Sequence, residues 1–149
     1  MNEFRVAKLE TPASLYLTNS TVIRGTVFLA EFSATHSGHE TMLDLMQSVE
    51  PMLPMLDLSG RFVLVGRGHI VAAEVAAAMA GAENLAGSVT AQIETTGGHM
   101  FRGELHMPAG MGERISDALN GDFDWHALQT ASTVTWLSRR HIVKATTNR

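Results

Sequence analysis

The stretch Arg67-Gly68-His69-Ile70-Val71 recurs as Arg139-Arg140-His141-Ile142-Val143, at a sequence offset of 139 − 67 = 72. Earlier in the chain, Arg24-Gly25 recurs as Arg102-Gly103, at an offset of 102 − 24 = 78. The matches keep the same order, so the chain is predicted to contain one structural unit twice. The offset decreases along the unit, so the second copy is shorter than the first. Most of the residues that it lacks correspond to 31–37 of the first copy. Such a loss is expected for a loop that varies between copies.

The two copies are predicted to be small units at 12–75 and 89–147, joined by an alanine- and glycine-rich linker at 76–88. A chain of 149 residues is long enough for one ordinary domain or for two very small ones. Domains of about 60 residues bury only roughly 60% of their unfolded surface. We therefore expect the copies to share a core or to pack tightly on each other.

Each copy is predicted to begin with a β-hairpin. In the first copy, Leu15 and Leu17 alternate with polar residues before an Asn19-Ser20 turn, and a second strand follows at 22–29. In the second copy, strands at 91–95 and 100–107 flank a Gly97-Gly98 turn, since glycine tolerates positive φ.

A helix is predicted after each hairpin. In the first copy, apolar residues recur at i, i+3, i+4 and i+7, which indicates one face of a helix: Met42, Leu45, Met46 and Val49. Ser37 and Glu40 are predicted to form a capping box at its start, and Pro51 is expected to end it. In the second copy the helix is expected to start near Gly112 and to stop at Gly121.

Each copy is predicted to close with a second hairpin, at 61–75 and at 132–146, with turns around Gly66-Arg67-Gly68 and Ser138-Arg139-Arg140. The order is then β-β-α-β-β, twice. This is a mainly β fold with short helices, of the α+β class. Such hairpins form either two small barrels or one pseudo-symmetric sandwich.

Composition excludes several classes of function. The formal charge of −4 disfavours broad binding of RNA, which needs a basic face. The chain has no cysteine, which excludes disulfides, thiolate zinc sites and cysteine nucleophiles. No stretch approaches the roughly 20 apolar residues of a membrane helix, so a soluble cytoplasmic protein without a membrane partner is expected.

The arginine turns are the first candidate site, made of Arg67, Gly68, Arg139 and Arg140. A guanidinium is a flat, always charged donor fork that can hold a phosphate or carboxylate or stack on a base. The structural alternative is that Gly68 supplies a turn conformation before a half-buried strand, and this alternative is favoured. Arg140 replaces that glycine in the second copy, so the turn does not need glycine in both.

His36 and His39 are the only metal candidates. With the adjacent Glu40 they could bind zinc or another divalent ion. However, the spacing H-S-G-H-E differs from the H-E-x-x-H of metalloproteases, and the second copy has no histidine there. We therefore expect no cofactor.

Two further groups of residues have mainly structural interpretations. Glu40 and Asp44 recur as Glu113 and Asp117, and each pair is expected to lie on a solvated helix face. The apolar segment from Met42 to Leu56 and the two tryptophans of the second copy are expected to pack in the core or at an interface. These tryptophans are Trp125 and Trp136.

The second copy resembles a family of small bacterial proteins of unknown function, whose members carry G-E-L-H-x-P and R-L-S-D-x-L-N patterns. The matching stretches are Gly103-Glu104-Leu105-His106-Met107-Pro108 and Arg114-Ile115-Ser116-Asp117-Ala118-Leu119-Asn120. The first copy looks like a more diverged relative. This family implies no activity.

The stretch Val65-Gly66-Arg67-Gly68-His69-Ile70-Val71 is also similar to the late hairpin of Sm-like barrels in RNA-binding ring proteins, roughly I-R-G-x-x-I. The resemblance implies small Sm-like or SH3-like barrels, with Arg67 and Gly68 at the RNA-contacting loop. A helix stands where the third strand of that family should be, and the family's other RNA-binding loop has no match. The barrel therefore carries over more readily than the RNA binding.

No catalytic motif is found: the sequence has no glycine-rich phosphate loop and no G-x-S-x-G elbow. We expect a non-enzymatic protein-interaction or assembly module, whose partner is another protein or a second copy of the chain. The alternatives are an Sm-like nucleic-acid-binding protein that uses the arginine turns and a small-ligand or metal-binding regulator.

Overall fold

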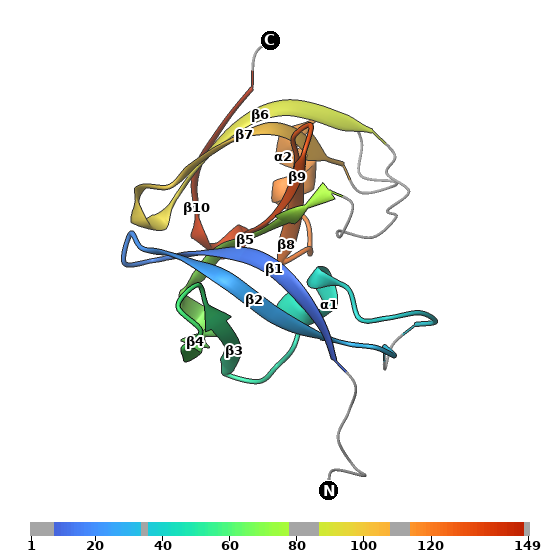
Figure 1. The fold of residues 1–149 in the computed structure, drawn as a ribbon. Coiled ribbons are helices and arrows are strands. Elements are labelled where there is room, and N and C mark those ends of the chain that lie inside the picture. Colours follow the sequence, from blue (N-terminus) through green and yellow to red (C-terminus); the bar gives the residue numbers. More distant parts are fainter. Residues whose placement is uncertain (1–7, 34–35, 78–86, 108–113, 148–149) are drawn as a thin grey trace, which may run out of the picture.

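A computed structural model of the protein describes residues 8–33, 36–77, 87–107 and 114–147. These residues form ten antiparallel strands and two short α-helices (Figure 1). We refer to 8–77 as the first half and to 87–147 as the second half. The protein is mainly β, as predicted.

The first half contains β1 (Lys8–Leu17), β2 (Val22–Ala30), α1 (Met42–Met46), β3 (Met52–Asp57), β4 (Phe62–Gly66), the 3-10 turn η1 (Arg67–His69) and β5 (Ile70–Ala76). The second half contains β6 (Ser88–Thr95), η3 (Thr96–Gly98), β7 (Met100–His106), α2 (Ile115–Leu119), β8 (Trp125–Gln129), β9 (Thr133–Ser138), η4 (Arg139–His141) and β10 (Ile142–Thr147). Strands, helices and the late 3-10 turn thus follow in the same order in both halves. Most of the expected linker, 78–86, lies outside the described residues.

The predicted first hairpins are confirmed. β1 pairs with β2, with Leu15 opposite Ile23, and β6 pairs with β7, with Ile93 opposite Phe101. In the first hairpin, Ser20 takes a positive φ of 72° at the turn.

The predicted second hairpins are wrong in their pairing. β4 and β5 follow each other along the chain, but β4 pairs with β3, whereas β5 pairs with β1 and β9. In the second half, β9 pairs with β8 and β5, and β10 pairs with β6. β3 and β8 were not predicted, so each half has five strands rather than four.

All ten strands join one open sheet in the order β10-β6-β7-β8-β9-β5-β1-β2-β3-β4. In Figure 1, β6, β7 and β10 occupy the upper part of the molecule and β1 to β4 the lower part, with β5 crossing between them. The pairing of β5 with β9, here called the seam, joins the halves. The sheet is not closed, so the predicted barrels are not confirmed, and β4 and β10 are the two end strands.

The glycine of the repeated Arg-Gly pair allows a close approach of strands. A Cβ on Gly25 would meet the carbonyl oxygen of Leu56 in β3, and a Cβ on Gly103 would lie 2.6 Å from the carbonyl oxygen of Gln129 in β8. Real Cβ atoms are essentially never found below 3.0 Å from another heavy atom. Side chains at these positions would force the strands apart.

Both helices are shorter than predicted. The N-cap of α1 is Thr41, whose side chain accepts from the Asp44 amide in a capping box, so the predicted capping box of Ser37 and Glu40 is wrong. Val49 lies beyond the helix and is almost fully exposed. In the second half, α2 ends at the C-cap Asn120, and Gly112 lies outside the described residues.

Buried apolar side chains form two clusters, and each draws on both halves. The first cluster centres on β1 to β5 and includes Val134 and Trp136 of β9. The second centres on β6 to β9 and includes Val71 and Ala72 of β5. Because β5 and β9 supply both clusters, the halves share their core along the seam.

Candidate functional site

The two arginine turns lie next to each other across the seam. Arg67 and Gly68 of η1, with Arg139 and Arg140 of η4, line one cavity of about 570 Å³, here called the arginine cavity. The remaining lining residues are Leu119, Asp124, Trp125 and Ser138. The structure thus brings together all four residues of the predicted anion site.

Arg67 binds backbone carbonyls at and after the carboxyl end of α1, the helix of the first half. Its guanidinium donates to the carbonyl of Leu45 in α1, and its backbone N–H donates to the carbonyl of Pro51 at 2.9 Å. Burial lowers the pKa of Arg67, and its Nε is buried without a hydrogen-bond partner. Arg67 therefore closes the carboxyl end of α1, where unpaired carbonyls favour a cation.

Arg139 does the same in the second half. Its Nη1 donates to the carbonyl of Gly121, just beyond α2, at 2.6 Å, and its backbone N–H donates to the carbonyl of Asp124 at 2.9 Å. Its Nη2 also lies 3.8 Å from the Asp124 carboxylate. Two of the three predicted cations thus hold the fold together.

Gly68 and Arg140 occupy matching places in the two turns. Gly68 lies in the 3-10 turn η1, as predicted, but it does not have a positive φ and a Cβ there would meet nothing within 4 Å, so the turn does not require glycine. Its carbonyl accepts from His141 Nε2 at 2.9 Å, across the seam. Arg140 is exposed and has no hydrogen-bond or ion-pair partner among the described residues, so its charge is available at the rim of the arginine cavity.

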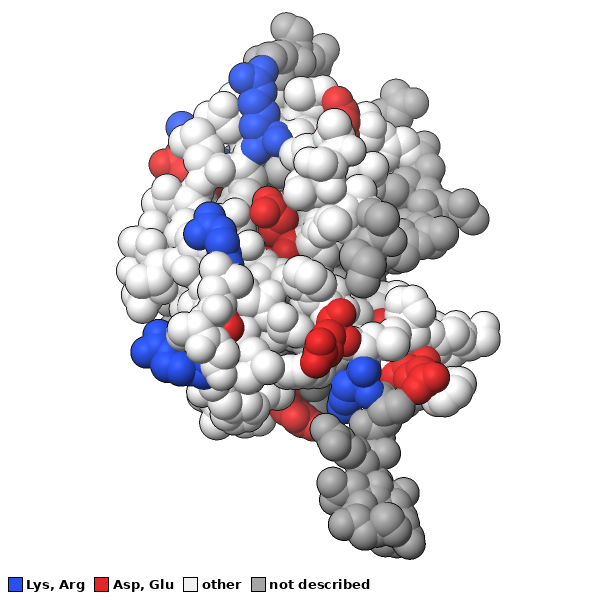
Figure 2. Space-filling view, in the orientation of Figure 1, with Lys and Arg blue, Asp and Glu red and all other residues white. Residues whose placement is uncertain are grey.

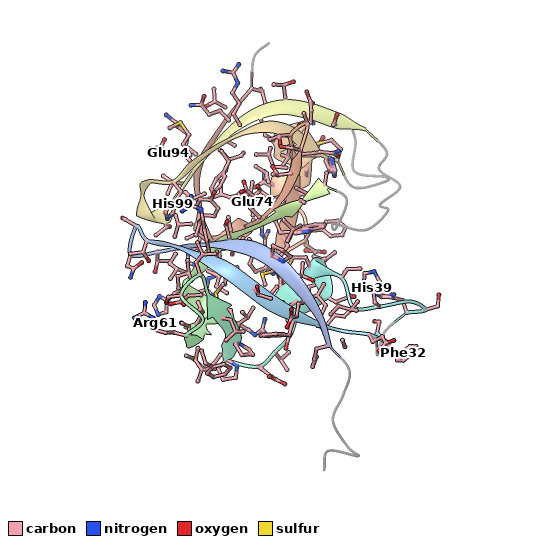
Figure 3. All side chains as sticks on the ribbon, viewed as in Figure 1. Phe32, His39, Arg61, Glu74, Glu94 and His99 are labelled. Carbon is pink, nitrogen blue, oxygen red and sulfur yellow. The ribbon has the colours of Figure 1, made fainter. Side chains whose placement is uncertain are left out.

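The histidines proposed for a metal do not come together as a ligand set. His36 Nε2 lies 2.6 Å from Asp44 Oδ2, and a hydrogen bond with the Ser37 backbone, together with Asp44, raises the pKa of His36. The His39 ring bonds instead to the carbonyl of Glu40 at 2.8 Å, on a loop that projects from the molecule (Figure 3). Within the described ranges, no group of three histidines or carboxylates has the arrangement of a metal site.

The recurring carboxylates are not a solvated helix face in the first half. Glu40 precedes α1 and accepts from the Ala30 amide at 3.0 Å, while Asp44 accepts from the Thr41 amide at 2.8 Å. In the second half, Asp117 pairs with Arg114 at 3.4 Å, and Glu113 lies outside the described residues.

The end strand β4 exposes large apolar side chains that sequence analysis did not single out. Phe62 is 65% exposed and Leu64 is 54% exposed. On the opposite end strand, β10, Val143 is 66% exposed. The sequence carries no signal for this exposure, because the matching positions of the second half, Val134 and Trp136, are also apolar although they are buried.

The residues that match Phe62 and Leu64, Val134 and Trp136, lie at the seam, where β9 pairs with β5. Within it, Ala73 lies opposite Trp136, and Val75 opposite Val134. Both Val134 and Trp136 are only 5% exposed. Trp136 is thus an interface anchor, as expected, and Trp125 packs against the same cluster.

A second contact between the halves lies at the hairpin tips. His99 Nε2, at the β6–β7 tip, donates to the carbonyl of Leu17 at 2.8 Å. Tyr16 packs edge-on against His99 and Phe101, with ring centroids 5.3 and 4.8 Å apart. Figure 3 shows His99 directed toward the β1–β2 hairpin. The two halves are therefore in contact at the hairpin tips as well as at the seam.

One buried histidine was not among the predicted site residues. His126 in β8 is buried, and its Nε2 lacks a hydrogen-bond partner. Burial lowers the pKa of His126, and the nearby Arg139 adds to this effect, while a hydrogen bond with the Phe123 backbone and the charge of Asp124 oppose it. The imidazole is therefore neutral in the folded protein near pH 7.

Comparisons of the chain with family models, with curated proteins and with solved structures find no match. In the part of the chain that the structure describes, neither helix has the length and apolar character needed to cross a membrane.

Proposed function

We propose that this protein is a non-enzymatic assembly module, built from two related units, whose chains associate through the end strands of the sheet. One observation carries the proposal: β4 and β10 are both end strands, and both expose large apolar side chains, Phe62, Leu64 and Val143. An unpaired strand edge is a template for pairing with another chain, and soluble proteins usually protect it. Apolar side chains on such an edge support its use as a contact.

The absence of the usual edge protection strengthens this proposal. β4 contains no charged residue and no proline, which are common protections of edge strands. β10 contains one charged residue, Lys144, and its Nζ lies 3.5 Å from the Glu94 carboxylate of the neighbouring strand β6. Lys144 is thus engaged by its own sheet.

The test is the mass of the chain in solution. Light scattering should give a mass well above the 16.1 kDa of a single chain, rising with concentration. Leu64→Lys and Val143→Lys should each lower it, because each places a charge in the proposed contact. Val49→Lys is the matched control, since Val49 is exposed outside the sheet. A concentration-independent monomer would contradict the proposal.

A second candidate function is anion or nucleic-acid binding in the arginine cavity. It is favoured by the convergence of two turns that lie far apart in the sequence and by the unpaired charge of Arg140 among the described residues. Figure 2 argues against a broad nucleic-acid surface, because basic and acidic side chains are interspersed on the face that it shows. Any binding would therefore be local.

Arg140→Ala is the substitution that tests this candidate, because Arg67 and Arg139 also hold helix ends and their loss would perturb the fold. Binding of single-stranded RNA or of inorganic phosphate should weaken in Arg140→Ala, and the salt dependence of RNA binding should become shallower by about one counterion. Arg24→Ala, which removes an exposed arginine from β2, should bind as the wild type does. No binding at any salt concentration would exclude this function.

A further inference from the structure

We infer that β10 of one copy pairs with β4 of a second copy, antiparallel and in the register of the seam, so that copies join head to tail. The inference rests on the proposed function and specifies its partner and its geometry. At the seam, β5 pairs with β9. β5 directly follows the arginine turn η1, and β9 directly precedes the arginine turn η4. The end strands are the remaining members of these two kinds: β10 follows η4, and β4 precedes η1.

Burial of matching positions points to the same pairing. At the offset of 72, Phe62 and Leu64 match Val134 and Trp136. The two residues of β9 are buried in the first cluster, where β5 and the rest of the first half pack against them, whereas the two residues of β4 are exposed. A second half whose β10 pairs with β4, as β5 of the first half pairs with β9, would cover them.

The other end strand shows the same difference. Val143 of β10 matches Val71 of β5 at this offset. Val71 is completely buried, whereas Val143 is 66% exposed. Both end strands therefore carry apolar side chains at positions that are buried where the seam supplies a partner.

The seam also fixes the register. At the offset of 72, the seam pair Ala73–Trp136 corresponds to Ala145 opposite Leu64 of the next copy. The seam pair Ala72–Leu137 corresponds to Lys144 opposite Val65. At the first of these pairs a small residue, alanine, again lies opposite a large one. A leucine side chain therefore has the space that the seam gives to a tryptophan.

Such a contact is heterologous, because it joins two different edges of the chain. A heterologous contact cannot be satisfied in an isolated two-fold pair of β4 edges or of β10 edges, and it produces a ring if the rotation closes or a filament if it does not. Every chain in a closed ring would have both of its end strands paired.

Cysteine crosslinking tests the register directly, because the chain has no cysteine of its own. The double variants Leu64→Cys with Ala145→Cys and Val65→Cys with Lys144→Cys place thiols directly opposite each other. Directly opposed Cα atoms are about 4.5 to 5.5 Å apart, which suits a disulfide. Two pairs are needed because hydrogen-bonded and non-hydrogen-bonded positions differ in geometry.

The matched control is Phe62→Cys with Ala145→Cys, which is offset by two residues, or roughly 6.8 Å along the strand. Mild oxidation of at least one in-register variant should convert most of the chain to reducible covalent multimers, with at least tenfold more than in the control. Leu64→Cys and Ala145→Cys alone should stay single chains on non-reducing gels. Covalent dimers of either single variant would instead show like-to-like pairing and overturn the inference.

Light scattering separates the failure of this inference from the failure of the proposed function. A multimer in which neither in-register pair crosslinks would refute the β10–β4 pairing and leave assembly in place. A monomer at all concentrations would refute both.

Discussion

Replacement of the two repeated glycines by alanine should destabilise the protein in a defined order. A Cβ on Gly103 would lie 2.6 Å from a carbonyl oxygen of β8. A Cβ on Gly25 would meet a carbonyl oxygen of β3 and would also lie 2.9 Å from two other backbone atoms of that strand. Overpacking of this kind costs about 1 to 3 kcal/mol. Because the obstructing atoms belong to backbone, only separation of the strands relieves the contact, so Gly25→Ala should cost more than Gly103→Ala.

Gly68→Ala is the control for the general effect of removing a glycine. A Cβ at Gly68 meets nothing within 4 Å, and the residue has no positive φ. The loss of chain entropy in the unfolded state should stabilise this variant by about 0.4 to 1 kcal/mol. The same gain partly offsets the cost at Gly25 and Gly103, which leaves a net loss of up to roughly 2.6 kcal/mol for Gly103→Ala.

Thermal unfolding followed by far-UV circular dichroism measures these differences. At about 2 to 4 °C per kcal/mol for a domain of this size, thermal midpoints should fall by several degrees for Gly25→Ala and rise slightly for Gly68→Ala. A wild-type midpoint for Gly25→Ala would refute the close strand approach. Equal losses at Gly68 and Gly103 would show that the cost is not set by the facing strand.

Two further predictions concern pH. Hydrogen bonds from the Ser59 hydroxyl and the Arg61 amide hold the pKa of Asp57 at about 2, below the ordinary value of 3.8, so its stabilising contribution is present above about pH 4 and is lost as the pH falls toward 2. Asp57→Asn should lower the urea midpoint at pH 7 and should make the loss of stability between pH 4 and 2 shallower; an unchanged acid profile would contradict this. Burial lowers the pKa of His126 below its ordinary 6.5, so stability should decrease as the pH falls below about 6.5, and His126→Leu should flatten this decrease. The exposed His39 is the control, and a His39→Leu profile as flat as that of His126→Leu would refute the assignment.

The hairpins that begin each half could be predicted because their pattern is local. Leu15 and Leu17 alternate with polar residues, and the turn residues follow directly. The missed strands lack such signals. β3 contains Pro54, which argues against a strand in sequence, and β8 has three consecutive buried residues rather than alternation.

The length of α1 could not be predicted from periodicity. Val49 continues the apolar spacing that begins at Met42, but the helix ends at Met46 and the chain turns toward β3. Apolar spacing indicates that a face is available, whereas capping and tertiary contacts decide where the helix ends. Here Thr41 and Arg67 hold the two ends, and Arg67 lies far along the chain.

The candidate site was predictable in its residues but not in its assembly. The recurring sequence stretches identified the turns that contain Arg67 and Arg139 as matching features. Their convergence on one cavity depends on the pairing of β5 with β9, which joins segments from the two halves of the chain. No local pattern encodes such a contact, and the same holds for the exposure of β4, which depends on which strand is last in the sheet.

The arginines that close the helices also constrain the order of folding. Isolated helices shorter than about 12 residues are marginal in water, and α1 has five residues. Its carboxyl end is completed by Arg67, 22 residues beyond Leu45, which is brought into place only when β3 and β4 have paired. Helix formation in each half therefore marks the end of folding rather than its beginning, and the amides of α1 should become protected from hydrogen exchange together with the sheet, not before it.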